Sequence, residues 1–360
     1  MTTLPKISHR KHLALVNDYE KAAALASLIY VTDTEPGIVR KRSGKGFSYQ
    51  LDEKIIHDKV IIERIKKLAI PPAWEMVWIC TRENGHIQAT GLDLKKRKQY
   101  RYHPLWTVLR NETKFHKMIE FGRSLPVLRL QLEKDLSIKE LTDKKVMATV
   151  ISLMERTYIR IGNTAYEKMN GSHGLSTLHD KHVKISGSEI SFNFKGKKSI
   201  EHSVKLSNRK LARIVEQCRD VPGKELFQYY DEDGNSRPID SGMLNNYIKE
   251  ITGQAFTAKD FRTWAGCLHF LLAFKNLELN TQEAPTKTVV NEMLDFVSKK
   301  LGNTRTVCKK YYVHPRIIEL YEQNKLKGYL EELDGIEEND DVSSLTNDEK
   351  VLMKLLEKVN

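Results

Sequence analysis

Four side chains between residues 160 and 312 have the chemistry needed to break and reform a phosphodiester bond. Without a metal ion, this reaction requires protein cations that stabilise the charged transition state, a nucleophile, and a proton donor for the leaving oxygen. Arginine suits the first task because its planar guanidinium matches the oxygens of a phosphate. The candidates are Arg160, Arg262, Lys181 and Tyr312.

Each candidate also has a purely structural explanation. Arg160 lies among apolar neighbours and could be a partly buried arginine with an acidic partner. Arg262 follows an expected helix start, where free backbone N–H groups favour an anion, but it could equally be a surface arginine paired with Asp260. Lys181 could be a solvated hairpin lysine. Lysines precede Tyr312 and would favour its phenolate, although a tyrosine pair on a helix more often belongs to a core.

Cofactor-binding motifs are missing from the sequence. It contains no P-loop, no GxGxxG and no HExxH, and its acidic residues show no metal-binding spacing. Nucleotide hydrolysis, a nicotinamide cofactor and two-metal nuclease chemistry are therefore not expected. The four cysteines lie far apart without a CxxC pair, so we expect neither a zinc site nor disulfides, and a reducing cytosol fits. We expect no metal and no small-molecule cofactor.

Charge is distributed unevenly along the 360 residues. The formal net charge is +12, but ten acidic and three basic side chains give residues 331–360 a charge of −7, so residues 1–330 carry +19. Such a basic body suggests a polyanionic partner. Basic residues alternate with aromatic residues and glycines at 40–49 and 95–103, a pattern that is typical of nucleic-acid contacts, although either cluster alone could be a solvated loop.

The patterning predicts an α+β protein with two domains and a tail. Residues 1–105 should form a small N-terminal antiparallel β-rich domain, which includes a hairpin from Val77–Cys80 and His86–Thr90. Residues 106–325 should form a larger, mainly α-helical domain with a small β-sheet insert at about 175–206. Residues 326–360 are expected to be an acidic tail with a short amphipathic helix.

Local signals predict where the helices of the larger domain begin and end. Ser207 and Thr304 are expected N-caps, another helix should begin near Asp240, and Thr257 should begin a helix with Asp260 in a capping-box arrangement. A helix over 287–301 should stop at the following glycine, and the next helix should carry Tyr311 and Tyr312. The apolar runs are too short for a membrane span and the N-terminus lacks an apolar signal core, so a membrane or secreted protein is not expected.

In this order the motifs resemble the type IB DNA topoisomerases, in their compact bacterial and poxvirus-like form. The resemblance runs from about residue 31 to residue 320. The motifs that match the N-terminal DNA clamp of the family are Ile70–Trp74 (IPPAW), Ala89–Asp93 (ATGLD) and Arg97–Trp106 (RKQYRYHPLW). Those that match its catalytic domain are Tyr158–Asn163 (YIRIGN), Gly174–Leu178 (GLSTL), Lys181–His182, Lys259–Thr263 (KDFRT), Leu301–Thr304 (LGNT) and Tyr312–Pro315 (YVHP).

The resemblance implies a role for each matching residue. Tyr312 matches the nucleophile that forms a 3′-phosphotyrosyl bond; adjacent Tyr311 is turned about 100° away on a helix, and the motif spacing selects Tyr312. Arg160 and Arg262 match the pair that holds the non-bridging phosphate oxygens, and Lys181 matches the general acid. Asn303 stands where many relatives carry histidine, and it can donate a hydrogen bond but cannot act as an acid. The positions that match DNA contacts in the clamp are Lys95, Arg97, Tyr100 and Tyr102.

The resemblance also implies a mechanism and a partner. The covalent bond conserves the energy of the broken phosphodiester, so a monomer clamped on double-stranded DNA would relax positive and negative supercoils without ATP or metal, in the cytoplasm at the nucleoid. A tyrosine recombinase is an alternative, but it would normally show His-x-x-Arg where this chain has Lys259 and Asp260 before Arg262. A non-catalytic DNA-binding protein is a further alternative, against which every expected catalytic position is present.

Overall fold

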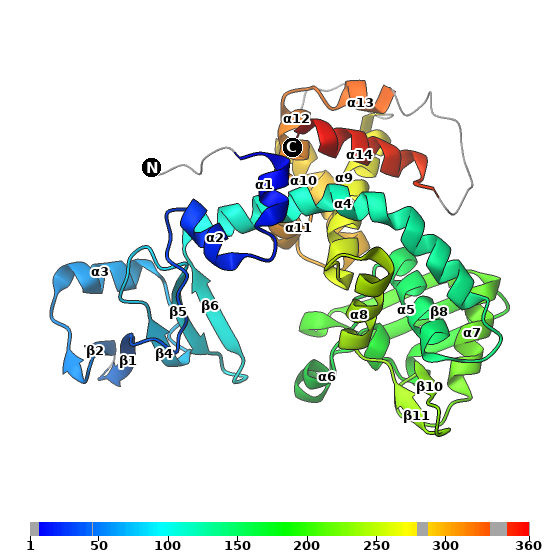
Figure 1. The fold of residues 1–360 in the computed structure, drawn as a ribbon, viewed down its shortest axis with the longest axis horizontal. Coiled ribbons are helices and arrows are strands. Elements are labelled where there is room, and N and C mark those ends of the chain that lie inside the picture. The colour runs from blue at the N-terminus through cyan, green and yellow to red at the C-terminus, as the bar shows by residue number, and fades with distance from the viewer. Residues whose placement is uncertain (1–6, 45, 279–286, 332–343, 360) are drawn as a thin grey trace. The chain divides into compact units, whose positions relative to one another are not determined.

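The computed structural model describes residues 7–44, 46–278, 287–331 and 344–359 (Figure 1). The chain forms two compact units, of which the first ends at Lys117 and the second begins at Met118. This division falls inside the long helix α4 (Pro104–Leu136). The division into three parts at residues 105 and 325 that the sequence suggests stays a prediction.

A six-stranded antiparallel sheet dominates the first unit, with strand order β3-β2-β1-β4-β5-β6. The strands are β1 (Ile38–Ser43), β2 (Gly46–Leu51), β3 (Lys54–Ile55), β4 (Glu75–Ile79), β5 (Ile87–Leu92) and β6 (Lys98–Tyr102). The helices are α1 (His9–Ala14), α2 (Tyr19–Leu25) and α3 (Lys59–Lys67). Ile65 of α3 is buried together with Ile38, Val77, Ile79 and Ala89 of the sheet, which removes one face of the sheet from water. The predicted β-rich unit and its β4–β5 hairpin are confirmed.

The second unit is mainly helical and is built around α5 (Asp143–Thr157). Eleven of the fifteen residues of α5 are buried, and the helix contacts α7, α8, α9, β9 and β10. The other helices are α6 (Thr164–Asn170), α7 (Arg209–Arg219), α8 (Ser241–Thr252), α9 (Ala258–Glu278), α10 (Lys287–Leu301), α11 (Arg305–Tyr311), α12 (Pro315–Glu322), α13 (Lys327–Glu331) and α14 (Asn347–Val359). A helix that is buried all round is the centre of its domain.

Short strands and 3₁₀ turns complete the second unit. The predicted β insert is an antiparallel sheet of β7 (Val183–Ser186), β8 (Glu189–Lys195) and β9 (Glu201–Ser207), and β10 (Gln228–Tyr230) pairs with β11 (Ser236–Pro238). The 3₁₀ turns are η1 (Leu175–Thr177), η2 (Asp180–His182) and η3 (Lys197–Ser199). The α+β description is therefore confirmed.

Most of the predicted helix ends are observed, and two differ. Helix α8 begins beside Asp240, as predicted, and the side chain of Asp240 caps it. Thr304 caps α11 through its side chain, as predicted. Ser207 does not cap α7, because it is still paired in β9, and the cap is Asn208, whose side chain accepts from Leu211 N. Helix α11 ends at Tyr311, so Tyr312 is its C-cap residue instead of a helical residue.

The predicted C-terminal helix is α14. Its four predicted apolar residues, Val351, Leu352, Leu355 and Leu356, are all buried. The acidic run at 337–341 lies outside the described residues. Over the described ranges of the chain, none of the helices combines the length and the apolar composition that a membrane span needs.

Candidate active site

Arg262 is a buried arginine that joins two helix ends. It lies one turn into α9 and only 4% of it is exposed, so it is not a surface residue. Its Nη1 donates to the carbonyl of Tyr158, the left-handed C-cap of α5, and its Nη2 donates to the carbonyl of Leu301 at the end of α10 at 2.6 Å. Its Nε is buried without a hydrogen-bond partner in the described part of the chain. The arginine is thus fixed on one side by backbone oxygens while one donor remains unused.

Arg160 reaches the same helix end from the segment that follows α5. Both of its terminal nitrogens lie 3.4 Å from the carbonyl of Gly302, and Nη2 donates to Oδ1 of Asn303. These partners are neutral oxygens, so within the described part of the chain Arg160 has no acidic hydrogen-bond partner of the kind that the structural explanation requires. Oδ1 of Asn303 is occupied by Arg160, and its Nδ2 donates one N–H to the carbonyl of Leu301 at 3.4 Å. The second N–H of Nδ2 is the donor that a phosphate oxygen could use.

Tyr312 completes this group from the loop after α11. Its amide donates to the carbonyl of Cys308 at 2.9 Å, and its ring centroid is 5.4 Å from the guanidinium carbon of Arg262. A Cβ atom at Gly266 of α9 would lie 2.7 Å from both the Cβ and the carbonyl oxygen of Tyr312. The backbone of Tyr312 therefore rests directly on α9, at a point where only glycine fits.

The electrostatics of the group favour an anion between the two arginines. Burial lowers the pKa of Arg160, and the charge of Arg262 lowers it further, to about 10. Burial alone would raise the pKa of Tyr312, but the positive charges of Arg262, Arg160 and Lys259 outweigh it and lower the pKa below its usual value of 10.0. Two like charges held close together are relieved by a bound anion, and a phenolate is stabilised in the same place.

The structure adds His202, which the sequence analysis missed. Its ring stacks on Phe194 at 5.0 Å between centroids, and it contacts Gly302, whose carbonyl accepts from Arg160. Burial and then the charges of Arg160 and Arg262 lower the pKa of His202. The alternation along β9 was the available signal, because it puts residue 202 on the same face as the half-buried positions 204 and 206.

Lys181 does not contact this group directly. It is exposed on η2 and lines a cavity that His202 also lines. A second lysine that the sequence analysis missed, Lys197, follows Gly196 in the connection between β8 and β9. A Cβ at Gly196 would lie 2.6 Å from the ring of His202, so this connection packs on the histidine that borders Gly302. Lys181 therefore lines a cavity together with His202, and Lys197 directly follows the glycine that packs on His202.

The four residues matched to the clamp lie at one edge of the sheet in the first unit. Tyr100 and Tyr102 stand on the edge strand β6, are 43% and 45% exposed, and stack at 5.7 Å between ring centroids. Lys95 is exposed in the turn before β6. Arg97 instead pairs with Asp93, at 2.6 Å from Nη2 to Oδ2, and this pairing lowers the pKa of Asp93 to about 2. The stacked tyrosines are thus open to a ligand, and Arg97 also holds the turn together.

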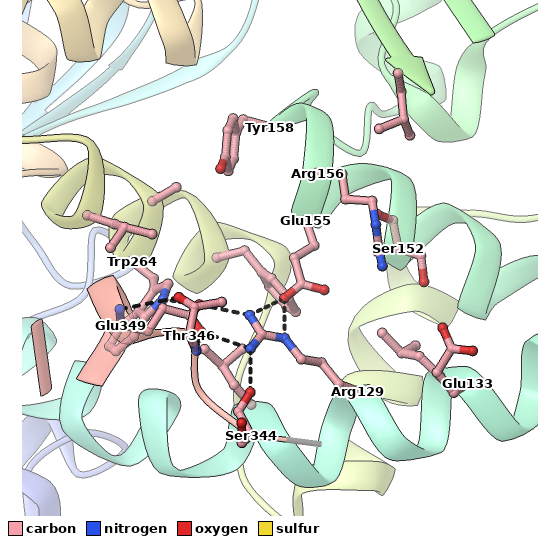
Figure 2. Close-up of a pocket in the computed structure, with 16 residues that line it drawn as sticks. Arg129, Glu133, Ser152, Glu155, Arg156, Tyr158, Trp264, Ser344, Thr346 and Glu349 are labelled. Atoms are coloured by element: carbon pink, nitrogen blue, oxygen red, sulfur yellow. Dashed lines mark hydrogen bonds and ion pairs between the residues drawn. The ribbon is translucent and has the colours of Figure 1, made fainter. Parts of the chain in front are cut away.

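The C-terminal helix is fastened to α9 next to Arg262. Figure 2 shows Arg129 of α4 between the carboxylates of Glu155 and Glu349. These residues line a cavity of about 610 Å³, which Tyr158 also lines. Both terminal nitrogens of Arg129 donate to Glu349 at 2.8 Å, and the indole nitrogen of Trp264 donates to it at 3.1 Å. Trp264 lies two residues after Arg262 on α9. Glu349 thus links α14 to the helix that carries the buried arginine.

We predict that Glu349→Gln lowers the free energy of unfolding by about 1.5–3 kcal/mol, the usual contribution of hydrogen bonds to a charged group. Burial would raise the pKa of Glu349, but Arg129, Thr346 N and Trp264 hold it below 4.5. A carboxyl with a lowered folded pKa stabilises the protein above its unfolded pKa and stops doing so as pH falls through the folded value. Urea unfolding should therefore separate the two proteins at pH 7 and bring them together in acid.

Glu357→Gln on the same helix is the matched control. Glu357 pairs with Arg123, but both side chains are about half exposed. Exposed pairs contribute little, so its free energy of unfolding should stay within about 1 kcal/mol of wild type. Equal effects of the two substitutions would contradict the role given to Glu349.

Comparison with known families agrees with this arrangement. Residues 96–339 match the family model of the eukaryotic DNA topoisomerase I catalytic core, and residues 46–93 match that of the bacterial DNA topoisomerase IB N-terminal domain. The chain belongs to the type IB DNA topoisomerases, and it is an enzyme of that class.

Its relatives include several viral proteins. DNA topoisomerase 1B of Acanthamoeba polyphaga mimivirus is 34% identical over 80% of this chain and 88% of its own. DNA topoisomerase 1B of Vaccinia virus (strain Copenhagen) is 27% identical over 64% of this chain and 71% of its own. DNA topoisomerase 1 of Rabbit fibroma virus (strain Kasza) is also 27% identical, over 64% of this chain. The resemblance to the family is confirmed, in both its bacterial and its poxviral form.

Proposed function

We propose that this type IB topoisomerase relaxes positive and negative supercoils of double-stranded DNA, as a monomer and without ATP or a metal ion. The observation that carries this proposal is the gathering of Arg160, Arg262 and Asn303 around the phenol of Tyr312. Preorganised cationic donors can stabilise a pentacoordinate phosphorus in the way that a metal ion otherwise would. The lowered pKa of Tyr312 supports its role as the attacking group.

The proposed reaction conserves its bonds and charges. Oη of Tyr312 forms a bond to phosphorus as the bond to the 5′-oxygen breaks, and Arg160 and Arg262 hold the two non-bridging oxygens. The phenolic proton leaves to solvent, and a lysine protonates the 5′-oxygen. The product is a 3′-phosphotyrosyl bond and a free 5′-hydroxyl, whose strand rotates about the intact strand. Attack by that hydroxyl reverses each step, so religation consumes no ATP.

The first unit is proposed to hold DNA through its β6 edge. Tyr100 and Tyr102 offer flat, exposed rings to bases or sugars, and Lys95 offers a charge to phosphate. Arg97 is proposed to contact DNA while it remains paired with Asp93. Phosphate contacts of this kind release counterions, so the affinity for DNA should fall steeply as salt rises.

Plasmid relaxation in excess EDTA without ATP tests the proposal. The wild-type enzyme should relax positively and negatively supercoiled plasmid alike, and denaturant added during the reaction should trap protein on a 3′ end. Relaxation that requires ATP or Mg²⁺, or protein trapped on a 5′ end, would overturn it. Loss of relaxation with site-specific strand joining between two duplexes would favour the recombinase alternative.

We propose Lys181 as the lysine that protonates the leaving 5′-oxygen, with Lys197 as the second candidate because Gly196 packs on His202. We predict that Lys181→Ala slows single-turnover cleavage by about 10²–10⁴-fold, as loss of a general acid does. A substrate with sulfur in place of the 5′-oxygen needs no proton on leaving, so it should restore the rate.

Lys197→Ala, measured in parallel on both substrates, decides between the two lysines. The variant whose defect the sulfur substrate repairs has lost the general acid. Repair in Lys197→Ala alone would transfer the role to Lys197. A defect that persists with sulfur in either variant would instead indicate a lysine that binds phosphate.

A further inference from the structure

A cluster of one carboxylate and three histidines lies outside the group around Tyr312. Glu167 stands on α6, His173 follows that helix, and His179 precedes η2. One ligand atom from each of these three lies within 4.8 Å of the other two. The third histidine, His182, packs its ring 4.4 Å from that of His173.

The carboxylate of Glu167 has an unused, buried oxygen. Glu167 is only 6% exposed. Its Oε1 accepts from Lys224 Nζ at 2.8 Å and lies 3.2 Å from Nε2 of His179, whereas its Oε2 is buried with no hydrogen-bond partner in the described residues. A buried charged oxygen without a donor is costly, so a native protein normally gives it a partner. Oε2 is one of the atoms that a cation could take.

His173 already has the orientation of a metal ligand. Its Nδ1 lies 2.6 Å from the carbonyl oxygen of Thr177. Because a carbonyl only accepts, Nδ1 carries the proton and Nε2 keeps a free lone pair. A ligating histidine typically donates its other ring N–H in this way, which fixes the tautomer and the ring.

His182 is excluded as a ligand by the same reasoning. Its Nδ1 accepts from the backbone N–H of His179 at 3.0 Å, so in the neutral ring the proton lies on Nε2. Neither nitrogen then has a free lone pair. By the same rule, the metal-free ring of His179 donates from Nε2 to Oε1 of Glu167, so it would bind a cation through Nδ1, or through Nε2 once that proton has left. The ligand set is therefore one carboxylate oxygen and two imidazole nitrogens.

We propose that Glu167, His173 and His179 bind a divalent transition-metal ion, with zinc as the ion of choice. Two imidazoles and a carboxylate are a ligand set that zinc takes, with water in the remaining position. The sequence analysis predicted no metal site, because Glu-x5-His-x5-His matches no motif and the ligands meet only through the turns after α6.

The proposed ion would have a structural role. Within the segment 173–182, the Leu175 amide donates to the carbonyl of Arg160 at 2.8 Å, and Lys181 stands near its end. An ion that joins this segment to α6 would fix the backbone of Arg160, in addition to the contacts that hold its guanidinium group. It takes no part in the proposed reaction, so relaxation in EDTA remains the expectation.

The test measures zinc binding by the full chain. Metal-free enzyme is titrated with Zn²⁺ against a chromophoric chelator, and Co²⁺ is used as a spectroscopic probe. Wild type should bind one ion, and Glu167→Gln and His179→Gln should each weaken binding by at least about 100-fold, more than loss of an outer-shell partner does. Zn²⁺ should raise the unfolding temperature of wild type and leave these variants unchanged.

Two further variants make the test specific. Lys224→Met should tighten binding about ten-fold, because it removes a positive charge that now pairs with Glu167. His182→Asn keeps an acceptor for the His179 amide and should still bind one ion.

Two results would overturn the proposal. One is a wild-type enzyme that binds no Zn²⁺ or Co²⁺. The other is Glu167→Gln and His179→Gln binding as tightly as wild type, which would place the ion away from these residues. Unfolding of each metal-free variant identifies any that fails to fold, and Lys224→Met then still decides, because unchanged or weaker binding there contradicts the site.

Discussion

Tyr312→Phe is expected to abolish the covalent attachment of the enzyme to DNA while leaving its noncovalent affinity for DNA intact. The substitution removes one oxygen atom and keeps the ring beside Arg262. Loss of the nucleophile should lower the cleavage rate on the order of 10⁶-fold, as it does in other enzymes that react through a covalent intermediate. The measurement is single-turnover formation of the protein–DNA adduct, with a binding assay at the same salt concentration.

Tyr311→Phe is the matched control. Tyr311 is the last residue of α11 and is 39% exposed, whereas Tyr312 is largely enclosed by the two arginines and α9. We expect adduct formation in Tyr311→Phe within a few-fold of wild type. Adduct formation by Tyr312→Phe, or its loss in Tyr311→Phe, would show that the nucleophile has been assigned to the wrong residue.

Arg262→Lys is expected to lower the cleavage rate by about 10²–10³-fold, the loss that follows removal of one preorganised donor from a charged transition state. Lysine keeps the charge but not the planar fork, two of whose nitrogens bind the carbonyls of Tyr158 and Leu301. An ammonium group cannot bind both carbonyls and a phosphate in one plane. Cleavage rate, DNA affinity and unfolding temperature should be measured together, because the fork also joins the ends of α5 and α10.

Arg262→Gln separates charge from geometry. Because the charge of Arg262 lowers the pKa of Tyr312, its removal should raise that pKa and move the pH profile of cleavage upward, whereas Arg262→Lys should move it less. A cleavage rate of Arg262→Lys equal to wild type would show that the arginine serves only to join the two helices. Identical pH profiles for the two variants would exclude its electrostatic effect on Tyr312.

Features written in short stretches of sequence could be predicted. Asp240 caps α8, and Thr257 with Asp260 begins α9, because an N-cap acts on backbone amides within three residues. The error at Ser207 was one residue long and arose because Ser207 pairs with Glu189 in the sheet. Such a competition between a strand and a cap is decided by tertiary pairing, which local signals do not contain.

The contacts that orient the side chains of the active site could not be predicted from local sequence signals. The resemblance to the family selected Arg160, Arg262, Asn303 and Tyr312, but not the backbone oxygens that orient the two arginines. Those oxygens become available only where α5 and α10 end side by side. The unpartnered oxygen of Glu167 likewise has no counterpart in the sequence, since it depends on how three separate turns pack.

Gly266 determines how closely the reacting groups are held. It lies four residues after Arg262 on α9, so the two positions share one face of the helix, about one 5.4 Å turn apart. The backbone of Tyr312 packs against Gly266, and the guanidinium group of Arg262 lies over the ring of Tyr312. The distance between the nucleophile and the guanidinium group is therefore set by a rigid helix, α9, instead of a loop. The space between α9 and Tyr312 cannot hold even the methyl group of an alanine at position 266. A substitution there can therefore inactivate the enzyme without altering any charge, any polar atom or any contact with DNA.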